Sequence, residues 1–481
     1  MLQTFLLITG AAVALLMASR RKGVEGALPL FAFLMVLLPV RAALPFVIDI
    51  TPQRALIWTL MLLTLAQGRR GLARGTRRES LLGLCALQMA WYVVSTWNSV
   101  LPILSFKSAF GQAVEYFPIY FIFAGVITHA ATVDRILRGI AAGLAVCCCL
   151  GVVEAYSGWN VVESCFPHIA GNFDLNPYQD VQRGLRIGVT YPHPILYGTA
   201  LAAGIPILLY LLTQQRMLHE SVLLWAGLAL MAFNLFKTSS RGPWAIAALS
   251  VAGLAALSTT GRVRRTVGAL AVTAVLVCVL RPGVWMTIAN LYTSTYDRSS
   301  PVALSYEYRS HLWRESTAQL AAHPERALWG FGRGTFYSLN LTSQWDDGKV
   351  RPLLSCDSAW IEILMDTGWA GLAITAALLL KPLRLVAQSW RRAPRPMRDR
   401  LLLLMVLLAA YYLEMLSVAI YSSWCQNVYT LWMFLGLATS SVRLLRQEAR
   451  SAGRRVRTVR PLPVAPREPF PIPPGAPVKV Q

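Results

Sequence analysis

Long apolar stretches, separated by short polar connections, run through most of the chain. Counting runs of about 17–25 apolar residues, the length that crosses a bilayer as a helix, predicts about 12–13 spans. The first run, Leu2 to Ser19, is followed directly by Arg20, Arg21 and Lys22. Because these charges follow the apolar run and do not precede it, we interpret it as a span and not as a signal peptide. The pattern predicts an all-α fold, a polytopic transmembrane helical bundle.

Basic residues recur at every second connection between the predicted spans. These clusters are Arg69 to Arg78, Arg135 with Arg138, Arg262 to Arg265, and Lys381 to Arg400. Because Lys and Arg accumulate in cytoplasmic loops, the alternation places the N-terminus outside and the C-terminus in the cytoplasm. Two of the connections on the outer side, Tyr156 to Thr190 and about 281–357, are long, and we expect function to lie there.

Composition and charge support a membrane protein. Of 481 residues, 55% are hydrophobic and 14% are charged, and the mean hydropathy is +0.49. A net charge of +22 would suggest nucleic acid as the partner of a soluble chain. Here most of that charge falls in short loops, where it sets topology and meets anionic lipid. We therefore expect the bilayer, and not nucleic acid, as a partner.

The chain divides into three regions. Residues 1–79 form N-terminal transmembrane helices, residues 80–445 form a membrane core with the outer loop 281–357, and residues 446–481 form a basic, Pro-rich tail. The tail cannot bury a core, so we expect it to be disordered. Within the loop, Tyr306 to His323 has the spacing of an amphipathic helix. That helix either lies along the bilayer surface or closes the bundle.

Charged residues near the outer face are the candidate functional groups. Arg186, Arg241 and Arg309 are placed to hold an anion, because an arginine close to apolar runs is costly unless it is paired or hydrated. The alternatives are snorkelling, a solvated loop charge and contact with lipid headgroups. Asp357 stands at the outer mouth of a predicted span, where it could also cap the helix. His193 lies between two prolines that fix its backbone, and it could instead be a structural histidine.

Three further residues are secondary candidates for the site. Lys107 and Glu115 lie close together in and beside one predicted span, where a carboxylate usually pairs with a lysine or arginine. Arg333 lies in the glycine-rich stretch from Gly330 to Gly334, which resembles at most an anion-binding turn. The sequence contains no metal-ligand spacing and no nucleotide fingerprint, so we expect neither a metal nor a cofactor.

The sequence also offers one candidate disulfide. Cys165 and Cys356 each fall in a long outer loop, and they could form a disulfide if that side is oxidising.

Five motifs in this order carry a resemblance to a known family. They are Arg186-Ile-Gly-Val-Thr-Tyr-Pro-His-Pro-Ile195, Thr238-Ser-Ser-Arg-Gly242, Arg309 with Trp313, His323-Pro324 leading to Gly330-Phe-Gly332, and Asp357-Ser-Ala-Trp-Ile-Glu-Ile-Leu-Met-Asp-Thr-Gly368 with Gly371. Together they resemble the O-antigen ligase and polymerase superfamily over roughly residues 80–445. The resemblance implies a glycosyltransferase of the bacterial inner membrane, active on the periplasmic face. Its donor would be an oligosaccharide linked to undecaprenyl pyrophosphate, and it would need neither metal nor nucleotide.

The resemblance also implies roles and partners. Arg186, Arg241 and Arg309 would bind the pyrophosphate, and Asp357 would be the first candidate for the general base, with His193 the second. A flippase and a chain-length regulator of the same pathway could act with the protein. The family commonly has twelve spans, so an additional N-terminal span would explain thirteen.

Two departures from the family pattern bear on the acceptor. The family's ligases usually have a histidine at the position of Asp357 and often an asparagine at the position of Ser358. The motif at Asp357 looks more like the exopolysaccharide branch, so we favour a polymerase that joins repeat units of an exopolysaccharide or O-antigen.

Two other functions remain open. A ligase would transfer finished glycan to lipid A core or a protein. A flippase or transporter of lipid-linked glycans would place its charges along a central cavity, whereas the conspicuous arginines here cluster at one face.

Overall fold

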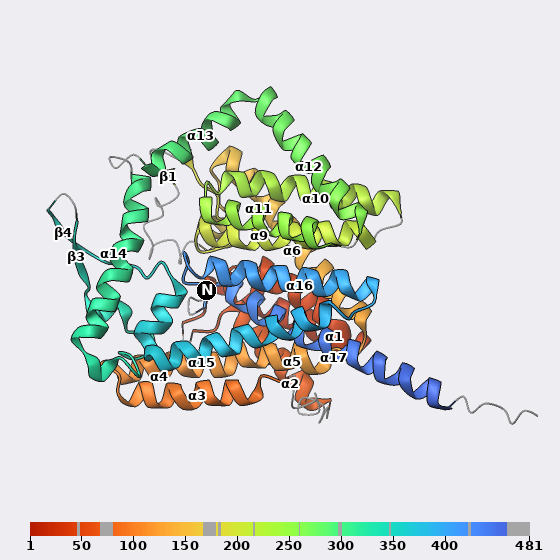
Figure 1. Cartoon of the computed structure of the whole chain (residues 1–481), viewed down its shortest axis with the longest axis horizontal. Coiled ribbons are helices and arrows are strands. Elements are labelled where there is room, and N and C mark those ends of the chain that lie inside the picture. Colours follow the sequence, from red (N-terminus) through yellow and green to blue (C-terminus); the bar gives the residue numbers. More distant parts are fainter. Residues whose placement is uncertain are drawn as a thin grey trace, which may run out of the picture.

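The computed structural model is a helical bundle with shorter elements gathered at one end (Figure 1). It describes residues 1–45, 49–67, 80–166, 179–180, 184–214, 217–258, 260–296, 301–345, 348–421 and 425–458.

Eight helices in this described part are long and apolar enough to cross a membrane. They are α1 (Leu2–Leu37), the continuous run of α4 (Pro102–Gly111), η2 (Gln112–Tyr116) and α5 (Phe117–Val126), α6 (Ala130–Ser157), α9 (Pro194–Gln214), α10 (Leu218–Lys237), α12 (Gly261–Leu280), α15 (Ala359–Trp390) and α17 (Gln426–Thr458). Two shorter apolar helices, α3 (Leu82–Trp97) and α11 (Arg241–Leu257), pack beside them. The predicted fold class, an all-α polytopic bundle, is confirmed.

The number of long helices is lower than the predicted 12–13 spans for physical reasons. Two predicted spans lie within α1, whose helical segments meet at Gly23, where φ is 70°. Glycine adopts this left-handed conformation without strain, and it directly follows the basic residues that end the first predicted span. The bundle also contains α2 (Pro52–Ala66), which is short, and α16 (Arg395–Glu414), which carries several charges.

Close helix contacts depend on small residues. A Cβ atom on Gly198 of α9 would lie 2.9 Å from Cβ of Pro243 in α11, and one on Gly204 would lie 2.7 Å from a Leu144 methyl in α6. Small residues let helix backbones approach closely where lipid offers no hydrophobic driving force between helices. As a result α9 is largely enclosed, because 83% of the residues in its apolar 18-residue stretch are buried.

The segment between α12 and α15 forms the cap at one end of the bundle. It contains α13 (Pro282–Tyr296), α14 (Pro301–Ala322), η3 (Pro324–Arg326), η4 (Phe336–Leu339) and an antiparallel hairpin of β3 (Thr342–Gln344) and β4 (Val350–Pro352). A second two-stranded ribbon, β1 (Gln179–Asp180) with β2 (Gly184–Leu185), and the short helix α7 (Val161–Cys165) precede α9. In Figure 1, α14 runs across the ends of the long helices and not along them.

The helix predicted within the long loop is confirmed as α14. Leu312 and Leu320 are buried in a small apolar cluster with Ile361 and Leu364 of α15. Two of the apolar residues that suggested an amphipathic helix therefore face protein. This packing favours the alternative in which the helix closes the bundle.

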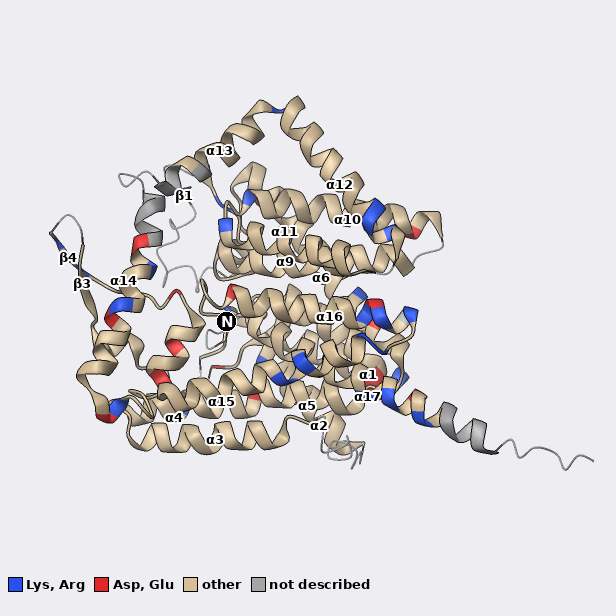
Figure 2. Ribbon diagram, in the orientation of Figure 1, with Lys and Arg blue, Asp and Glu red and all other residues tan. Residues whose placement is uncertain are grey.

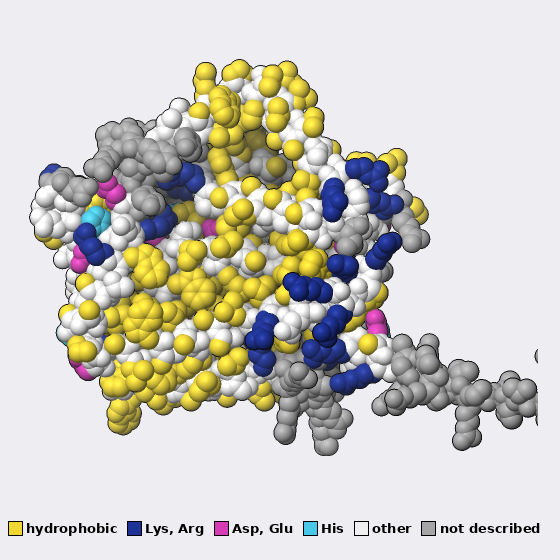
Figure 3. Space-filling view, in the orientation of Figure 1, with side chains coloured by type: hydrophobic (Ala, Val, Ile, Leu, Met, Phe, Trp, Pro, Cys, Tyr) yellow, Lys and Arg dark blue, Asp and Glu magenta, His cyan; other side chains and the backbone are white. Residues whose placement is uncertain are grey.

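Positive charge is distributed unevenly between the two ends of the bundle. Figure 2 shows Lys and Arg concentrated at the end away from α14, around the ends of α10, α16 and α17. Figure 3 shows the wide apolar surface between the two ends. This asymmetry is the one that the positive-inside rule requires if the capped end faces outward.

Two further predictions concern the C-terminal tail and a possible disulfide. Helix α17 continues to Thr458, beyond the tail boundary predicted at residue 446, and residues 459–481 lie outside the described part. Cys165 is exposed and Cys356 is buried, and both are free thiols. The possible disulfide between them is therefore not formed in this structure.

Candidate functional site

Asp357 lies directly before α15 and is held by its neighbours. Its Oδ1 accepts a hydrogen bond from Oγ of Ser355 at 2.8 Å. The Tyr308 hydroxyl on α14 in turn donates to the Ser355 carbonyl at 2.7 Å and accepts from the Ser355 backbone N–H at 2.8 Å. Burial raises the pKa of Tyr308, and the charge of Asp357 adds to that effect, so the phenol stays protonated. The N-cap of α15 is Ser358, so Asp357 does not cap the helix.

Arg309 connects α14 to this carboxylate. Its Nη2 lies 3.6 Å from Oδ2 of Asp357 and donates to the backbone carbonyl of Ser417 at 3.4 Å. The two side chains are 28% and 35% exposed, so the ion pair is open to solvent on one side. An incoming anion could therefore reach the guanidinium without displacing buried structure.

Arg186 joins the start of α9 to the loop before α11. It is buried, and its Nε donates to the Thr238 carbonyl while its Nη2 donates to Oγ of Ser240, both at 2.9 Å. Between these two acceptors, Ser239 has a left-handed φ of 47°, which turns the chain sharply into α11. Arg186 thereby fixes the loop that presents Arg241.

Arg241 is the first residue of α11 and is partly buried. The Ser240 N-cap makes no side-chain capping bond, and the first N–H groups of a helix lack partners within the helix itself. A guanidinium at the positive end of a helix dipole makes a favourable environment for an anion.

Glu414, which ends α16, lies at the centre of these contacts. Its side chain is buried, and Oε1 accepts a hydrogen bond from Oγ1 of Thr199 in α9 at 3.1 Å. A Cβ atom built on Gly242 would be 3.5 Å from Oε1 of Glu414 and 3.5 Å from Oγ of Ser417. Arg309 acts electrostatically on the same carboxylate. The N-terminus of α11, the Arg309 pair and the end of α16 therefore meet at one place.

Glu414 was not among the site residues predicted from the sequence, although the sequence contains a signal for it. It is a carboxylate at the end of the apolar run that begins at Leu401. Ionisable residues in such runs are rare and commonly functional. Oε2 of Glu414 has no hydrogen-bond partner among the described residues, which leaves one buried acceptor available.

His193 has a structural task. Its Nδ1 accepts a hydrogen bond from the Ile195 backbone N–H at 3.1 Å, at the start of α9. In a neutral imidazole the proton then resides on Nε2, so neither nitrogen offers a free basic lone pair. The structure places His193 at the same end of the bundle as the arginines, and its role as a second candidate base stays a prediction.

The secondary candidates separate from this cluster. Glu115 pairs with Arg54 of α2 at 2.7 Å, both nearly inaccessible, and accepts from the Tyr429 hydroxyl at 2.9 Å. Lys107 is exposed on α4, so of the two kinds of partner expected for Glu115, a lysine or an arginine, the structure shows an arginine. Because Arg54 neutralises Glu115 inside the bundle, we assign this pair to structure.

Arg333 is likewise engaged internally. Its Nη1 donates to the Tyr92 hydroxyl at 2.5 Å, and its guanidinium lies 4.8 Å from the centre of that ring. The N–H groups of Gly332 and Gly334 donate to the backbone carbonyl and the carboxylate of Asp366. The N–H donors of the glycine-rich stretch therefore serve α15, and the carboxylate that this turn holds is the one of Asp366.

That stretch supports a break in α15. Gly368 has φ 67° and ψ −173°, and the N–H of Trp369 donates to the carbonyl of Ala327 at 2.9 Å. A Cβ on Gly368 would lie 2.3 Å from the Leu328 carbonyl oxygen, so no larger residue fits without rearrangement. The break separates a short outer segment, which follows Asp357, from the long inner part of α15.

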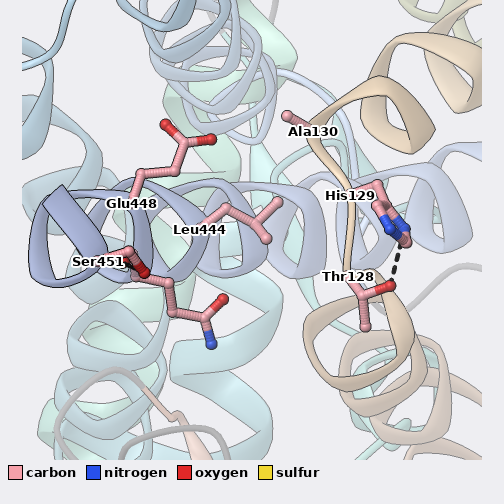
Figure 4. Close-up of a pocket in the computed structure, with 7 residues that line it drawn as sticks. Thr128, His129, Ala130, Leu444, Glu448 and Ser451 are labelled. Carbon is pink, nitrogen blue, oxygen red and sulfur yellow. Dashed lines mark hydrogen bonds between the residues drawn. The ribbon is translucent and has the colours of Figure 1, made fainter. Parts of the chain in front are cut away.

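A cavity of about 510 Å³ lies at the basic end of the bundle. Thr128, His129 and Ala130 line one side, and Leu444, Glu448 and Ser451 of α17 line the other (Figure 4). None of the candidate arginines lines it, so it is separate from the cluster at Asp357.

One known protein family matches part of this chain. Residues 226–376 match the family model described as O-Antigen ligase. This interval contains Arg241, Arg309 and Asp357, whereas Arg186, His193 and Glu414 lie outside it. A search of curated proteins found no significant match. Over these residues the match supports the resemblance to the O-antigen ligase and polymerase superfamily found from the motifs, and it does not distinguish the exopolysaccharide branch.

Proposed function

We propose that this chain, a membrane protein whose residues 226–376 belong to the O-antigen ligase family, polymerises glycan repeat units at the periplasmic face of the bacterial inner membrane. Its donor would be an oligosaccharide on undecaprenyl pyrophosphate. The observation that carries the proposal is that the start of α11, which holds Arg241, and the Arg309–Asp357 ion pair both lie close to Glu414, with Arg186 bracing the loop that leads to Arg241. These groups come from helices far apart in the sequence.

The reaction requires stabilisation of a leaving diphosphate. The acceptor hydroxyl oxygen attacks the anomeric carbon, the bond from that carbon to the phosphate oxygen breaks, and its electron pair stays on the diphosphate. Arg241 and Arg309 would bind this developing charge, because guanidinium groups match phosphate oxygens bidentately. The N-terminus of α11 adds its dipole to the same end.

Asp357 would take the proton of the acceptor hydroxyl. It is partly exposed, and the bond from Ser355 leaves Oδ2 directed toward Arg309 at 3.6 Å. When the diphosphate engages Arg309, the carboxylate loses a cationic neighbour and becomes a better base. An inverting displacement needs such a base beside the acceptor hydroxyl, on the face of the sugar opposite the leaving diphosphate. His193 remains the second candidate, disfavoured by its capping bond.

Glu414 would order the acceptor side of this site. Its available oxygen can accept a hydrogen bond from a sugar hydroxyl, while Thr199 holds the other oxygen. A carboxylate that accepts from a hydroxyl in a buried site discriminates strongly against a ligand lacking that hydroxyl.

A reconstitution assay tests the proposal. Purified protein is supplied with undecaprenyl-pyrophosphate-linked repeat units alone, and glycan length is measured by gel or mass spectrometry. A ladder of multiples that disappears in Arg309→Gln is the expected result. If no ladder forms, lipid A core is added, since transfer to that acceptor would identify a ligase.

A transporter is the third outcome of the test. No glycosidic bond would form with either acceptor, and labelled lipid-linked glycan would instead change leaflet in proteoliposomes. The arginine cluster at one end of the bundle favours an enzyme over this alternative.

A further inference from the structure

A second cavity lies at the basic end of the bundle, between the two segments of α1 and the start of α6. Its volume is about 700 Å³. Its lining includes Met17, Arg21, Lys22 and Leu30 of α1 and Arg135 and Arg138 of α6. Its lining comes from both segments of α1, before and after the break at Gly23.

The lining divides into a charged part and an apolar part. Arg21 and Lys22 of α1 and Arg135 and Arg138 of α6 supply four cations, all on exposed side chains, and no Asp or Glu lines the cavity. The remaining residues are apolar side chains and glycines. A ligand that fits must therefore combine a concentrated negative charge with a hydrocarbon chain.

The charged part is anchored on the side of α6. Nη2 of Arg135 donates to Oγ1 of Thr132 at 2.9 Å, and Thr132 donates to the Glu25 carboxylate at 2.8 Å. On the other side, α1 and α6 approach so closely that a Cβ on Gly139 would lie 2.3 Å from the Pro29 carbonyl oxygen. The cavity walls are thus connected by direct contacts between the two helices.

We infer that this cavity binds an anionic phospholipid, with its phosphate among the four cations and an acyl chain against Met17 and Leu30. Basic pockets between membrane helices on the cytoplasmic side are suited to such headgroups, and each nearby Lys or Arg contributes to the attraction. Zwitterionic lipid lacks the net negative charge that the four basic residues of the lining favour. The inference does not depend on glycosyl transfer.

The alternative is that these residues are ordinary topology-setting charges that attract lipid without a defined site. Arg391 and Arg392 provide the matched control, because both are exposed in the turn after α15 and neither lines the cavity. Figure 2 shows that basic residues of this turn region lie at the same end of the bundle. The double variants Lys22→Gln/Arg135→Gln and Arg391→Gln/Arg392→Gln remove the same charge from the two places.

Binding is measured on the full chain in neutral detergent, by native mass spectrometry with phosphatidylglycerol, cardiolipin or phosphatidylcholine. We expect anionic lipid to bind wild type and the control variant equally, and to bind the cavity variant about thirtyfold more weakly, which corresponds to about 2 kcal/mol for two cations. Phosphatidylcholine should bind all three weakly. Thermal unfolding without added lipid checks that both variants fold.

Equal losses in the two double variants would overturn the inference, because diffuse charge would then explain binding. Wild type without preference for anionic lipid would overturn it as well. Binding as strong as that of wild type in the double variant Lys22→Arg/Arg135→Lys, which keeps both charges, would support the inference further. Because no outcome uses enzymatic activity, failure here leaves the proposed function untouched.

Discussion

Replacing Asp357 by asparagine separates two roles of this side chain. The substitution keeps its size, and the amide oxygen can still accept the hydrogen bond from Ser355. It removes the negative charge that lies 3.6 Å from Nη2 of Arg309, and it removes the basic lone pair. The question is which of these losses dominates.

The two roles predict different magnitudes. At 3.6 Å in a water-like dielectric the charge pair contributes about 1 kcal/mol, and exposed pairs usually contribute no more than this. Loss of this charge pair alone would lower kcat by roughly fivefold. Loss of a general base lowers rates by about 10² to 10⁴. We expect the larger effect, with thermal stability nearly unchanged.

The assay is the initial rate of glycan extension on lipid-linked repeat units in proteoliposomes. Ser355→Ala is the control, because it removes one hydrogen bond and keeps the carboxylate, and we expect it to retain at least a tenth of the activity. Asp357→His should recover part of the lost rate, with a pH profile shifted toward the histidine pKa. If Asp357→Asn stays within fivefold of wild type, Asp357 is not the base.

Three other outcomes test the surrounding structure. Arg241→Lys should fold normally and lose at least 90% of activity, because one ammonium group cannot bind two phosphate oxygens in a fork; a fully active variant would exclude that bidentate role. Glu414→Gln should raise KM for the acceptor by about tenfold while donor binding is kept, and Thr199→Val should do so more weakly; an unchanged KM in both would remove Glu414 from the acceptor site. Gly368→Ala should destabilise the protein by about 3 kcal/mol through its clash and positive φ, seen as a lower unfolding temperature; Gly83→Ala, with open space around it, is the control that should not.

The membrane architecture follows from local pattern, and it was therefore predictable. Apolar length and the alternation of basic loops are imposed by the bilayer itself, residue by residue. One part of the difference between the predicted spans and the long helices arises at Gly23, where two predicted spans form one element. A single residue that permits a left-handed turn is visible in sequence, but the path of the chain after it depends on packing.

The site was only partly predictable because its parts come from separate helices. The motifs pointed to Arg241, Arg309 and Asp357; the structure pairs Arg309 with Asp357 and places Gly242, the neighbour of Arg241, near Glu414, while the catalytic roles stay predictions. The partner of Glu115 and the role of Glu414 depend on which helices touch, across 61 residues for the Arg54 bond and 215 for the Thr199 bond. No local pattern specifies such distant contacts.

Charged groups of the site belong to two sets of helices that meet at α16. Arg186 precedes α9 and Arg241 begins α11, whereas Arg309 lies on α14 and Asp357 precedes α15. The Thr199–Glu414 bond spans the boundary between these sets. The relative alignment of these two sets therefore depends on the apolar joint that α9 and α11 form with α16, and not on the charged groups themselves. Displacements of about 1 Å can cost about a hundredfold in rate, so catalytic defects should also arise from uncharged substitutions along this joint.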